Sequence, residues 1–175
     1  IGAPNNDASG NNNGHVRIYE YRAYTQADED ANTYHYTSRI QNETQAKPLI
    51  VTVNADTAPV VGNSYWTQLG ADIDGEAAYD QSGKSVSLNN DGSILAIGAP
   101  YNKANIQGNV GEAGHVRIYQ YSNNSWTQLG ADIDGEAEDY HCGNSVSLNS
   151  DGNIVAIGVP RSDSNGTHSG YAQVY

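Results

Sequence analysis

A 60-residue internal repeat constrains the fold of this chain more than any other feature of its sequence. The segment WTQLGADIDGE occupies positions 66–76 and recurs unchanged at positions 126–136. The match continues, because GKSVSLNNDGSILAIGAP at 83–100 aligns with GNSVSLNSDGNIVAIGVP at 143–160. A partial earlier copy supplies IGAP at 1–4 and GHVRIYEY at 14–21. In such an array each repeat is one supersecondary unit, and neighbouring units cover its hydrophobic face.

Each full repeat predicts four short β-strands. In the first full copy we expect these strands at 66–69, 85–88, 94–98 and 115–121. The tight turn Asn-Asp-Gly at 90–92 joins the second strand to the third, and Pro100 ends the third because proline cannot donate to a ladder. Residues 94–97 are all apolar, which is typical of a strand buried on both faces. The repeat therefore predicts sheets that stack on neighbouring sheets.

Composition narrows the class of protein further. The chain has 19 Gly and 13 Tyr but neither Phe nor Met, a mixture that suits short strands joined by turns. Its formal net charge of -12 excludes a nucleic-acid partner, because such binding requires a basic surface. No run of 18 apolar residues occurs, so we expect no membrane span.

These observations predict an all-β fold of β-propeller type, built from four-stranded antiparallel blades in about two and a half repeats of 60 residues. A blade is a small sheet that packs against other sheets on both faces, as the apolar third strand requires. The expected divisions are the second half of a blade repeat at 1–21, an insertion or linker with a candidate hairpin at 22–62, and full blade repeats at 63–121 and 122–175.

The repeated segments resemble the FG-GAP repeat, which is the blade unit of the integrin α-chain propeller. IGAP at 1–4 and 97–100 and IGVP at 157–160 resemble its GAP part, and Ser82-Gly83 and Cys142-Gly143 stand where the family has Phe-Gly. The segment from GEAAYDQSGK to AIGAP is similar to a divergent branch of this repeat family, which occurs as arrays in large secreted proteins of microbes and algae. The resemblance implies a propeller with an extracellular adhesive or scaffolding role, and it implies no reaction.

The acidic segment of each repeat is a candidate calcium site. Hard cations prefer several oxygen ligands in a compact loop. The carboxylates that qualify are Asp72, Asp74 and Glu76, with their copies Asp132, Asp134 and Glu136. They would hold Ca²⁺ weakly, or a sugar through bound Ca²⁺; the alternative is a solvated turn whose aspartates cap backbone N–H groups. We expect no other cofactor.

A second turn corresponds to the integrin-type calcium loop. It keeps only Asn89 and Asp91, or Asn149 and Asp151, as oxygen ligands, so we expect a turn without metal there.

No catalytic site is predicted. The carboxylates recur at equivalent positions of successive repeats, and no nucleophile, base and orienting group can be assembled from the sequence. His15 and His115 share one repeat position where the third copy has Tyr171, which favours framework packing, and His141 has no ligand spacing.

The segment 22–62 departs from the repeat. We expect a decorating hairpin or a join between modules, and the alternative is a loop that carries function. Glycosylation sequons begin at Asn42, Asn123 and Asn165, in agreement with secretion.

An incomplete propeller has two open faces with apolar surface and unpaired strand edges. The expected partners are further blade repeats of the same or neighbouring chains, as a homo-oligomer or a filament, with a glycan or protein ligand as a further candidate. The predicted function is an extracellular or cell-surface structural and adhesive module of a larger fibrous or surface protein. The alternative is a calcium-dependent ligand- or carbohydrate-binding propeller.

Overall fold

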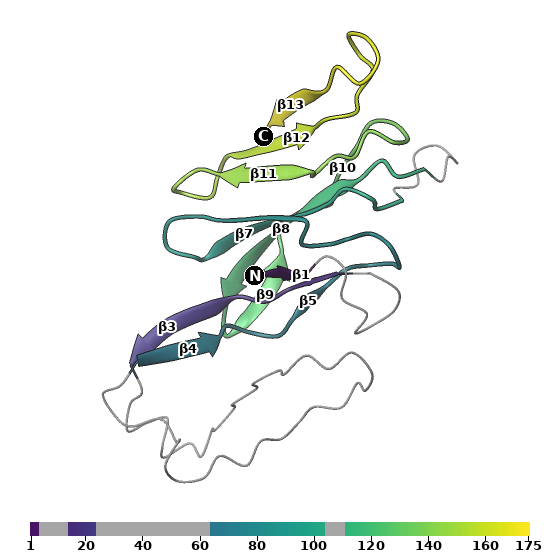
Figure 1. Ribbon diagram of the computed structural model, residues 1–175. Coiled ribbons are helices and arrows are strands. Elements are labelled where there is room, and N and C mark those ends of the chain that lie inside the picture. Colours follow the sequence, from purple (N-terminus) through teal and green to yellow (C-terminus); the bar gives the residue numbers. More distant parts are fainter. Residues whose placement is uncertain (4–13, 24–63, 104–110) are drawn as a thin grey trace. The chain divides into compact units, whose positions relative to one another are not determined.

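Short β-strands without any helix make up the described part of the chain, residues 1–3, 14–23, 64–103 and 111–175 of the computed structural model (Figure 1). The all-β prediction is therefore confirmed for these residues. Among them, no helix is long and apolar enough to cross a membrane. The chain divides into two compact units, residues 1–18 with 69–175 and residues 19–68, and each is described by itself.

The central sheet of the larger unit follows the predicted strand order. It contains β6 (Ser85–Leu88), β7 (Ile94–Ala99) and β8 (His115–Ser122), in which consecutive strands pair antiparallel. Two further strands, β9 (Ser125–Gln128) and β10 (Ile133–Asp134), both pair with the free edge of β8.

Two partial copies of this sheet flank the central one. The first sheet contains β1 (Gly2–Ala3), β2 (His15–Val16) and β5 (Ile73–Asp74). The last sheet contains β11 (Ser145–Leu148), β12 (Val155–Val159) and β13 (Tyr171–Val174). Pairing registers repeat as the sequence does, because His15 faces Asp74 in the first sheet and His115 faces Asp134 in the central one.

The Trp-containing strand joins the sheet of the preceding repeat. The sequence pattern had placed it at the start of its own repeat, yet β9 pairs with β8 and Trp126 lies opposite Tyr121. The turn between them explains this, because Asn123 and Asn124 both have positive φ, 51° and 60°. Two such residues form the tight hairpin turn that returns a strand directly beside its predecessor. A complete sheet therefore combines strands from two successive sequence repeats.

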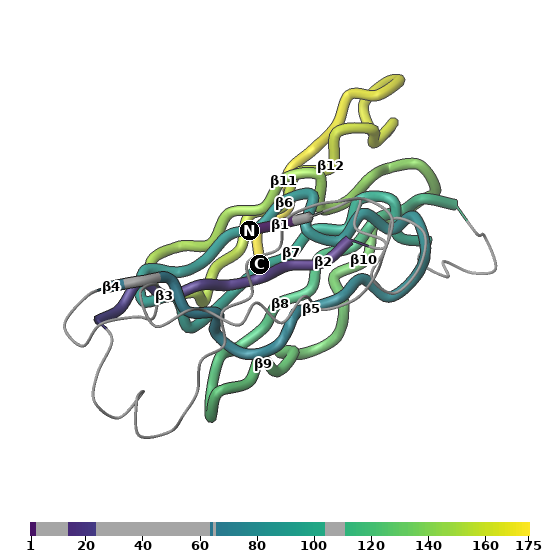
Figure 2. The backbone as a smooth tube through the Cα atoms, turned by 60° about the horizontal axis from the view of Figure 1, so that its bottom comes forward, coloured from purple at the N-terminus to yellow at the C-terminus, as the bar shows by residue number. Residues whose placement is uncertain are grey.

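Two apolar layers separate the three sheets. Between the first and central sheets lie Val16, Ile18, Ile73, Leu95, Ile97 and Tyr119. Between the central and last sheets lie Ala96, Val116, Cys142, Val155, Ile157 and Val159. Strand β7 contributes to both layers through alternate side chains, and all its residues are buried. The prediction that this strand is covered on both faces is confirmed, and β11 lies against β6 and β7 (Figure 2).

Glycine at the third-strand position allows successive sheets to approach closely. A Cβ added to Gly98 would overlap the carbonyl oxygen of Gly143, and one on Gly2 would overlap that of Gly83. Serines of the central sheet use the same approach. Ser85 Oγ donates to Gly143 O at 2.8 Å, and Ser87 Oγ accepts the backbone N–H of Leu148 at 3.0 Å. Gly2 and Gly98 are thus required by sheet stacking.

The smaller unit contains one described hairpin, β3 (Tyr19–Ala23) with β4 (Ser64–Gln68). Its rings Tyr21 and Trp66 lie opposite each other with centroids 5.3 Å apart. The same pair recurs in the central sheet as Tyr121 and Trp126, at 5.0 Å. Residues 24–63, which hold most of the predicted insertion and Asn42, lie outside the described residues.

Candidate functional site

The carboxylates of one acidic segment are directed to different partners. Asp72 is held by Arg17, whose Nε donates to Oδ1 at 2.7 Å and whose Nη2 donates to Oδ2 at 2.5 Å. Such a bidentate pair neutralises the carboxylate and fixes its direction. Asp74 is exposed and lies in β5, where its backbone carbonyl accepts a 2.8 Å hydrogen bond from Arg117 Nη2.

Glu76 and Asp132, from successive copies of the segment, meet around His115. The Nδ1 atom of His115 lies 3.9 Å from Glu76 Oε2 and 3.7 Å from Asp132 Oδ2. Arg117 Nη1 lies 3.7 Å from Glu76 Oε1, so a guanidinium occupies the same cluster. The structure thus brings together carboxylates of two repeats, with a histidine and an arginine.

Burial controls the protonation of this cluster. Removal from water lowers the pKa of His115 to about 4, with the charge of Arg117 acting in the same direction and Asp132 opposing it. Burial also raises the pKa of Glu76, against the favourable charge of Arg117. At neutral pH His115 is therefore a neutral imidazole with an arginine beside it.

The second acidic segment is tied to the last sheet and to its own strand. Asp132 Oδ1 accepts a hydrogen bond from Gln128 Nε2 at 2.7 Å, and Glu136 Oε1 accepts one from Gln173 Nε2 at 3.0 Å. Asp134 is exposed at the end of β10, and partial burial together with the charge of Asp132 raises its pKa. Calcium binding by the two acidic segments stays a prediction.

The turn that corresponds to the integrin-type calcium loop uses its polar side chains for local bonds. Asn89 Oδ1 accepts the backbone N–H of Ile94 at 3.0 Å. Asp91 Oδ1 accepts both the N–H and the hydroxyl of Ser93, at 2.9 and 2.5 Å. In the last sheet Asn149 Oδ1 accepts the backbone N–H of Ile154 at 3.0 Å. These oxygens stabilise the turn between two strands.

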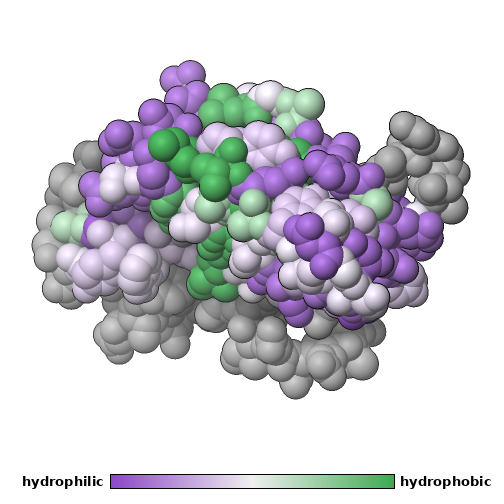
Figure 3. Space-filling view, turned by 90° about the horizontal axis from the view of Figure 1, so that it is seen from above, coloured by the Kyte–Doolittle hydropathy of each residue, from purple (hydrophilic) through white to green (hydrophobic). Residues whose placement is uncertain are grey.

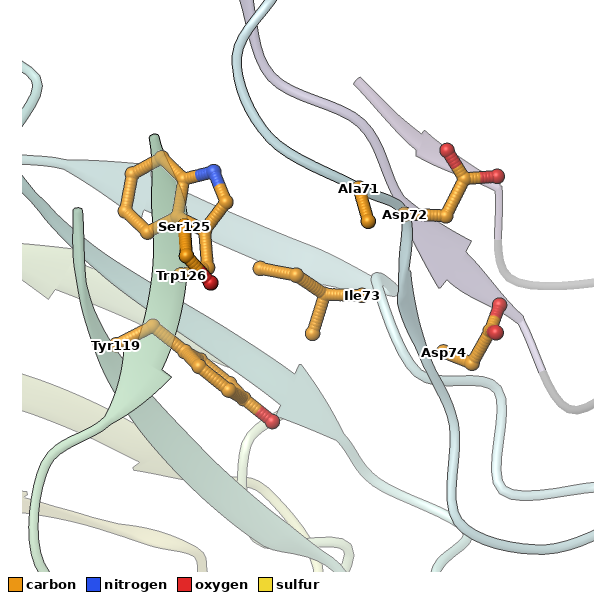
Figure 4. A pocket seen from close by; sticks show the side chains of 7 residues that line it. All are labelled: Ala71, Asp72, Ile73, Asp74, Tyr119, Ser125 and Trp126. Carbon is orange, nitrogen blue, oxygen red and sulfur yellow. The ribbon is translucent and has the colours of Figure 1, made fainter. Parts of the chain in front are cut away.

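A groove of about 260 Å³ lies where the first acidic segment meets the central sheet. Its lining comprises Ala71, Asp72, Ile73, Asp74, Tyr119, Ser125 and Trp126. In Figure 4, Ile73 separates the two aromatic rings from the two aspartates. Trp126 is fixed there because its Nε1 donates to Leu69 O at 2.9 Å. Both carboxylates point away from the aromatic rings in Figure 4, and that of Asp72 is paired with Arg17, so the rings and Ile73 supply an apolar face.

A group of three metal-ligating residues was not predicted. Glu112, Asp139 and His141 place one ligand atom each within 4.8 Å of one another. Sequence spacing gives no signal for it, because Glu112 lies in the loop before β8 and the other two lie in the loop before β11. The one available signal is a departure from the repeat, since Tyr79 and Gln81 occupy the positions of Asp139 and His141 in the preceding copy.

The described sequons lie on the surface. Asn123 is exposed in the turn between β8 and β9, and Asn165 is exposed in the loop before β13. Cys142 is fully buried, and burial raises the pKa of its thiol to about 11. The cysteine is therefore a small packing residue in the apolar layer between the central and last sheets.

Comparison with known proteins adds no relative. No protein-family model matches the sequence, and a search of curated proteins finds no match. The resemblance of the IGAP and GHVRIY segments to the FG-GAP repeat therefore stays a prediction.

Proposed function

We propose that this chain is a non-catalytic structural repeat module of an extracellular, FG-GAP-like propeller array, and that its end sheets stack on further copies of the same repeat. One observation carries the proposal. The apolar residues exposed on the last sheet and on β6 are the repeat equivalents of residues that pack between the central and last sheets.

The contact between the central and last sheets shows how two successive sheets of this repeat pack against each other. From the central sheet, Ala96, Val116 and Ile118 contribute to the shared apolar layer. From the last sheet, Val146 and Leu148 pack against that layer. This contact is heterologous, because one sheet contributes one face and its neighbour contributes the opposite face.

The outer face of the last sheet carries the equivalents of the residues that the central sheet contributes to that contact. Val174 is the equivalent of Ile118, and it is 68% exposed. Ala172 is the equivalent of the fully buried Val116, and it is exposed. An apolar patch crosses this face in the view from above (Figure 3). Burial of this patch against another sheet of the same repeat would be more favourable than its exposure to water.

Val86 and Leu88 of β6 repeat the second half within the central sheet. They are 38% and 44% exposed, whereas their equivalents Val146 and Leu148 pack against the central sheet. The described strands of the first sheet include no equivalent of β6 or β11 that could cover them. These side chains and the outer face of the last sheet are therefore two apolar surfaces that contact with further copies would bury.

The mass of the 175-residue chain, measured by light scattering over a range of protein and salt concentrations, tests this proposal. We expect a mass above the 18.7 kDa of one chain that rises with concentration. Salt should strengthen association, because it screens the repulsion between chains of charge -12.

Two variants test contact through these two surfaces. Val174→Glu and Leu88→Glu each place a charge on one of the two exposed apolar surfaces, so each alone should abolish growth beyond one chain. Mixing the two should restore a single junction and a mass of two chains, because each variant keeps the apolar surface that the other lacks. The control is Tyr79→Asp, since Asp139 occupies the equivalent position with a similar positive φ. Monomers at every concentration would contradict the proposal.

The groove beside Trp126 favours a second candidate function. Its aromatic rings suit the apolar face of a carbohydrate, and Asp74 is the carboxylate at its edge that is not paired with Arg17. A chain that remains a monomer would favour this alternative, because a binding module does not require stacking partners.

A further inference from the structure

The loop before β8 and the loop before β11 converge on a buried imidazole. His141 Nε2 lies 3.6 Å from Glu112 Oε2, and Asp139 completes a group whose ligand atoms all lie within 4.8 Å of one another. Asp139 is exposed and Glu112 is partly exposed, so the group opens to solvent on its carboxylate side.

The His141 side chain provides an observation independent of the carboxylates. Its side chain is 5% exposed, and Nε2 has no hydrogen-bond partner. A buried polar nitrogen without a partner costs about 1–3 kcal/mol unless something satisfies it. This nitrogen lies 3.6 Å from Glu112 Oε2, and the ring of Tyr101, 4.7 Å away between centroids, packs against the imidazole.

The geometry points to a site for a divalent transition-metal ion of the Zn²⁺ class, held by Glu112, Asp139 and His141. One imidazole nitrogen and two carboxylate oxygens suit Zn²⁺, whereas Ca²⁺ prefers oxygen ligands alone. Three protein ligands leave a further coordination position for water or a group from another molecule.

The charges around the imidazole favour a cation. The charged groups that act on His141 include the carboxylates of Glu112 and Asp139 and the guanidinium of Arg161. Two carboxylates against one guanidinium leave this group with a net negative charge.

The cluster around His115 differs in the position of its guanidinium. It also contains two carboxylates and a histidine, but Arg117 Nη1 lies 3.7 Å from Glu76 Oε1. One of the two carboxylates that a metal ion would need is therefore already paired with an arginine. The site at His141 is thus the better metal site among the described residues.

A metal at this site would connect two successive sheets. Glu112 precedes the central strand β8, and Asp139 and His141 precede β11 of the last sheet. Bound Zn²⁺ would hold the two loops together and raise the free energy of unfolding in proportion to its binding. This inference does not depend on whether the chain assembles with further copies.

The test is a titration of the metal-free full chain with Zn²⁺ by calorimetry, and with Co²⁺ by visible absorption. We expect one Zn²⁺ per chain, Co²⁺ d–d bands, and a melting temperature that rises with Zn²⁺. His141→Gln and Glu112→Gln should each weaken binding by at least about tenfold, because each removes a ligand.

The repeat supplies well-matched controls. Gln81 occupies the position of His141 in the preceding copy with φ of 54° against 57°, so His141→Gln should fold normally without metal. Glu138→Gln changes the charge beside the site without removing a ligand, and its Zn²⁺ affinity should be unchanged. Failure of Zn²⁺ to bind would overturn the inference. So would binding that survives His141→Gln but is lost in His115→Gln, because it would place the metal at the other cluster.

Discussion

At the scale of single residues, the histidine shared by the first two repeats is a structural group with an unusual protonation equilibrium. His115 is fully enclosed between the central sheet and the two acidic segments, and the charged groups that face it are Arg117, Glu76 and Asp132. Desolvation outweighs the attraction of the carboxylates, so the neutral form is favoured in the folded state.

We predict that His115 titrates near pH 4 in the folded chain, against about 6.5 when unfolded. Between these values the unfolded state binds more protons, so the free energy of unfolding falls as pH falls from 6.5 toward 4. The free energy of unfolding should fall by on the order of 3 kcal/mol over this range, and His115→Gln should remove this pH dependence. NMR titration of the imidazole measures the pKa directly. A value near 6.5 would show that the carboxylates offset burial.

At the scale of strands, sheet stacking depends on the glycine in the third strand of each repeat. Gly98 of β7 meets the backbone of the next sheet at Gly143 and the Ser85 hydroxyl of its own sheet, and together these leave no room for a methyl group. Gly158 occupies the same place in β12 but meets only the Ser145 side chain, whose hydroxyl can rotate away.

We predict that Gly98→Ala lowers the free energy of unfolding by about 3 kcal/mol, because the backbone of the adjoining sheet must move to admit the methyl group. Gly158→Ala is the matched control, with the same change in the same strand position, and should cost less than about 1 kcal/mol. Urea denaturation of both variants gives the comparison. Equal losses would show that the cost arises within the strand and not from stacking.

The sequence predicted the strands better than it predicted their partners. Residues 85–88 are β6 as expected, and the ends of β7 and β8 each differ from the expected ends by one residue. These strands are recognisable because alternation, a turn motif and a proline act locally. The pairing of the Trp126 strand with β8 was missed, because it depends on the backbone conformation of Asn123 and Asn124.

The group at His141 was beyond prediction for a different reason. Glu112 and His141 belong to separate loops, and only the stacking of the central and last sheets brings them within 3.6 Å. Residue spacing along the chain carries no record of such a contact. By contrast, the acidic segments were evident from composition, yet their partners Arg17, Arg117 and Gln173 were not.

At the scale of the larger unit, the central sheet is protected in a way that the last sheet is not. Strand β7 is paired on both edges and covered on both faces, whereas β13 is paired only with β12 and has exposed side chains. Stability in a stack of repeats is approximately the sum of the sheets and their contacts, so the ends open first.

We predict that backbone amides of β7 exchange with deuterium at least about 100-fold more slowly than those of β13 in dilute solution. NMR-detected exchange resolves the two strands. Raising the concentration should protect β13 and leave β7 unchanged, because stacking covers the outer face of the last sheet. Uniform exchange across both strands would indicate that the unit opens only as a whole.

Because the last strands of each sheet come from the following repeat, the boundaries of the 60-residue sequence repeat differ from the boundaries of the folded sheet. WTQLGADIDGE is identical in its two copies, and in each described copy it follows the strand that it completes. An unequal crossover between those two copies would add or delete 60 residues and leave the junction sequence unchanged. Every strand would still find its neighbour, so arrays of this repeat can lengthen or shorten by whole sheets without passing through a misfolded intermediate.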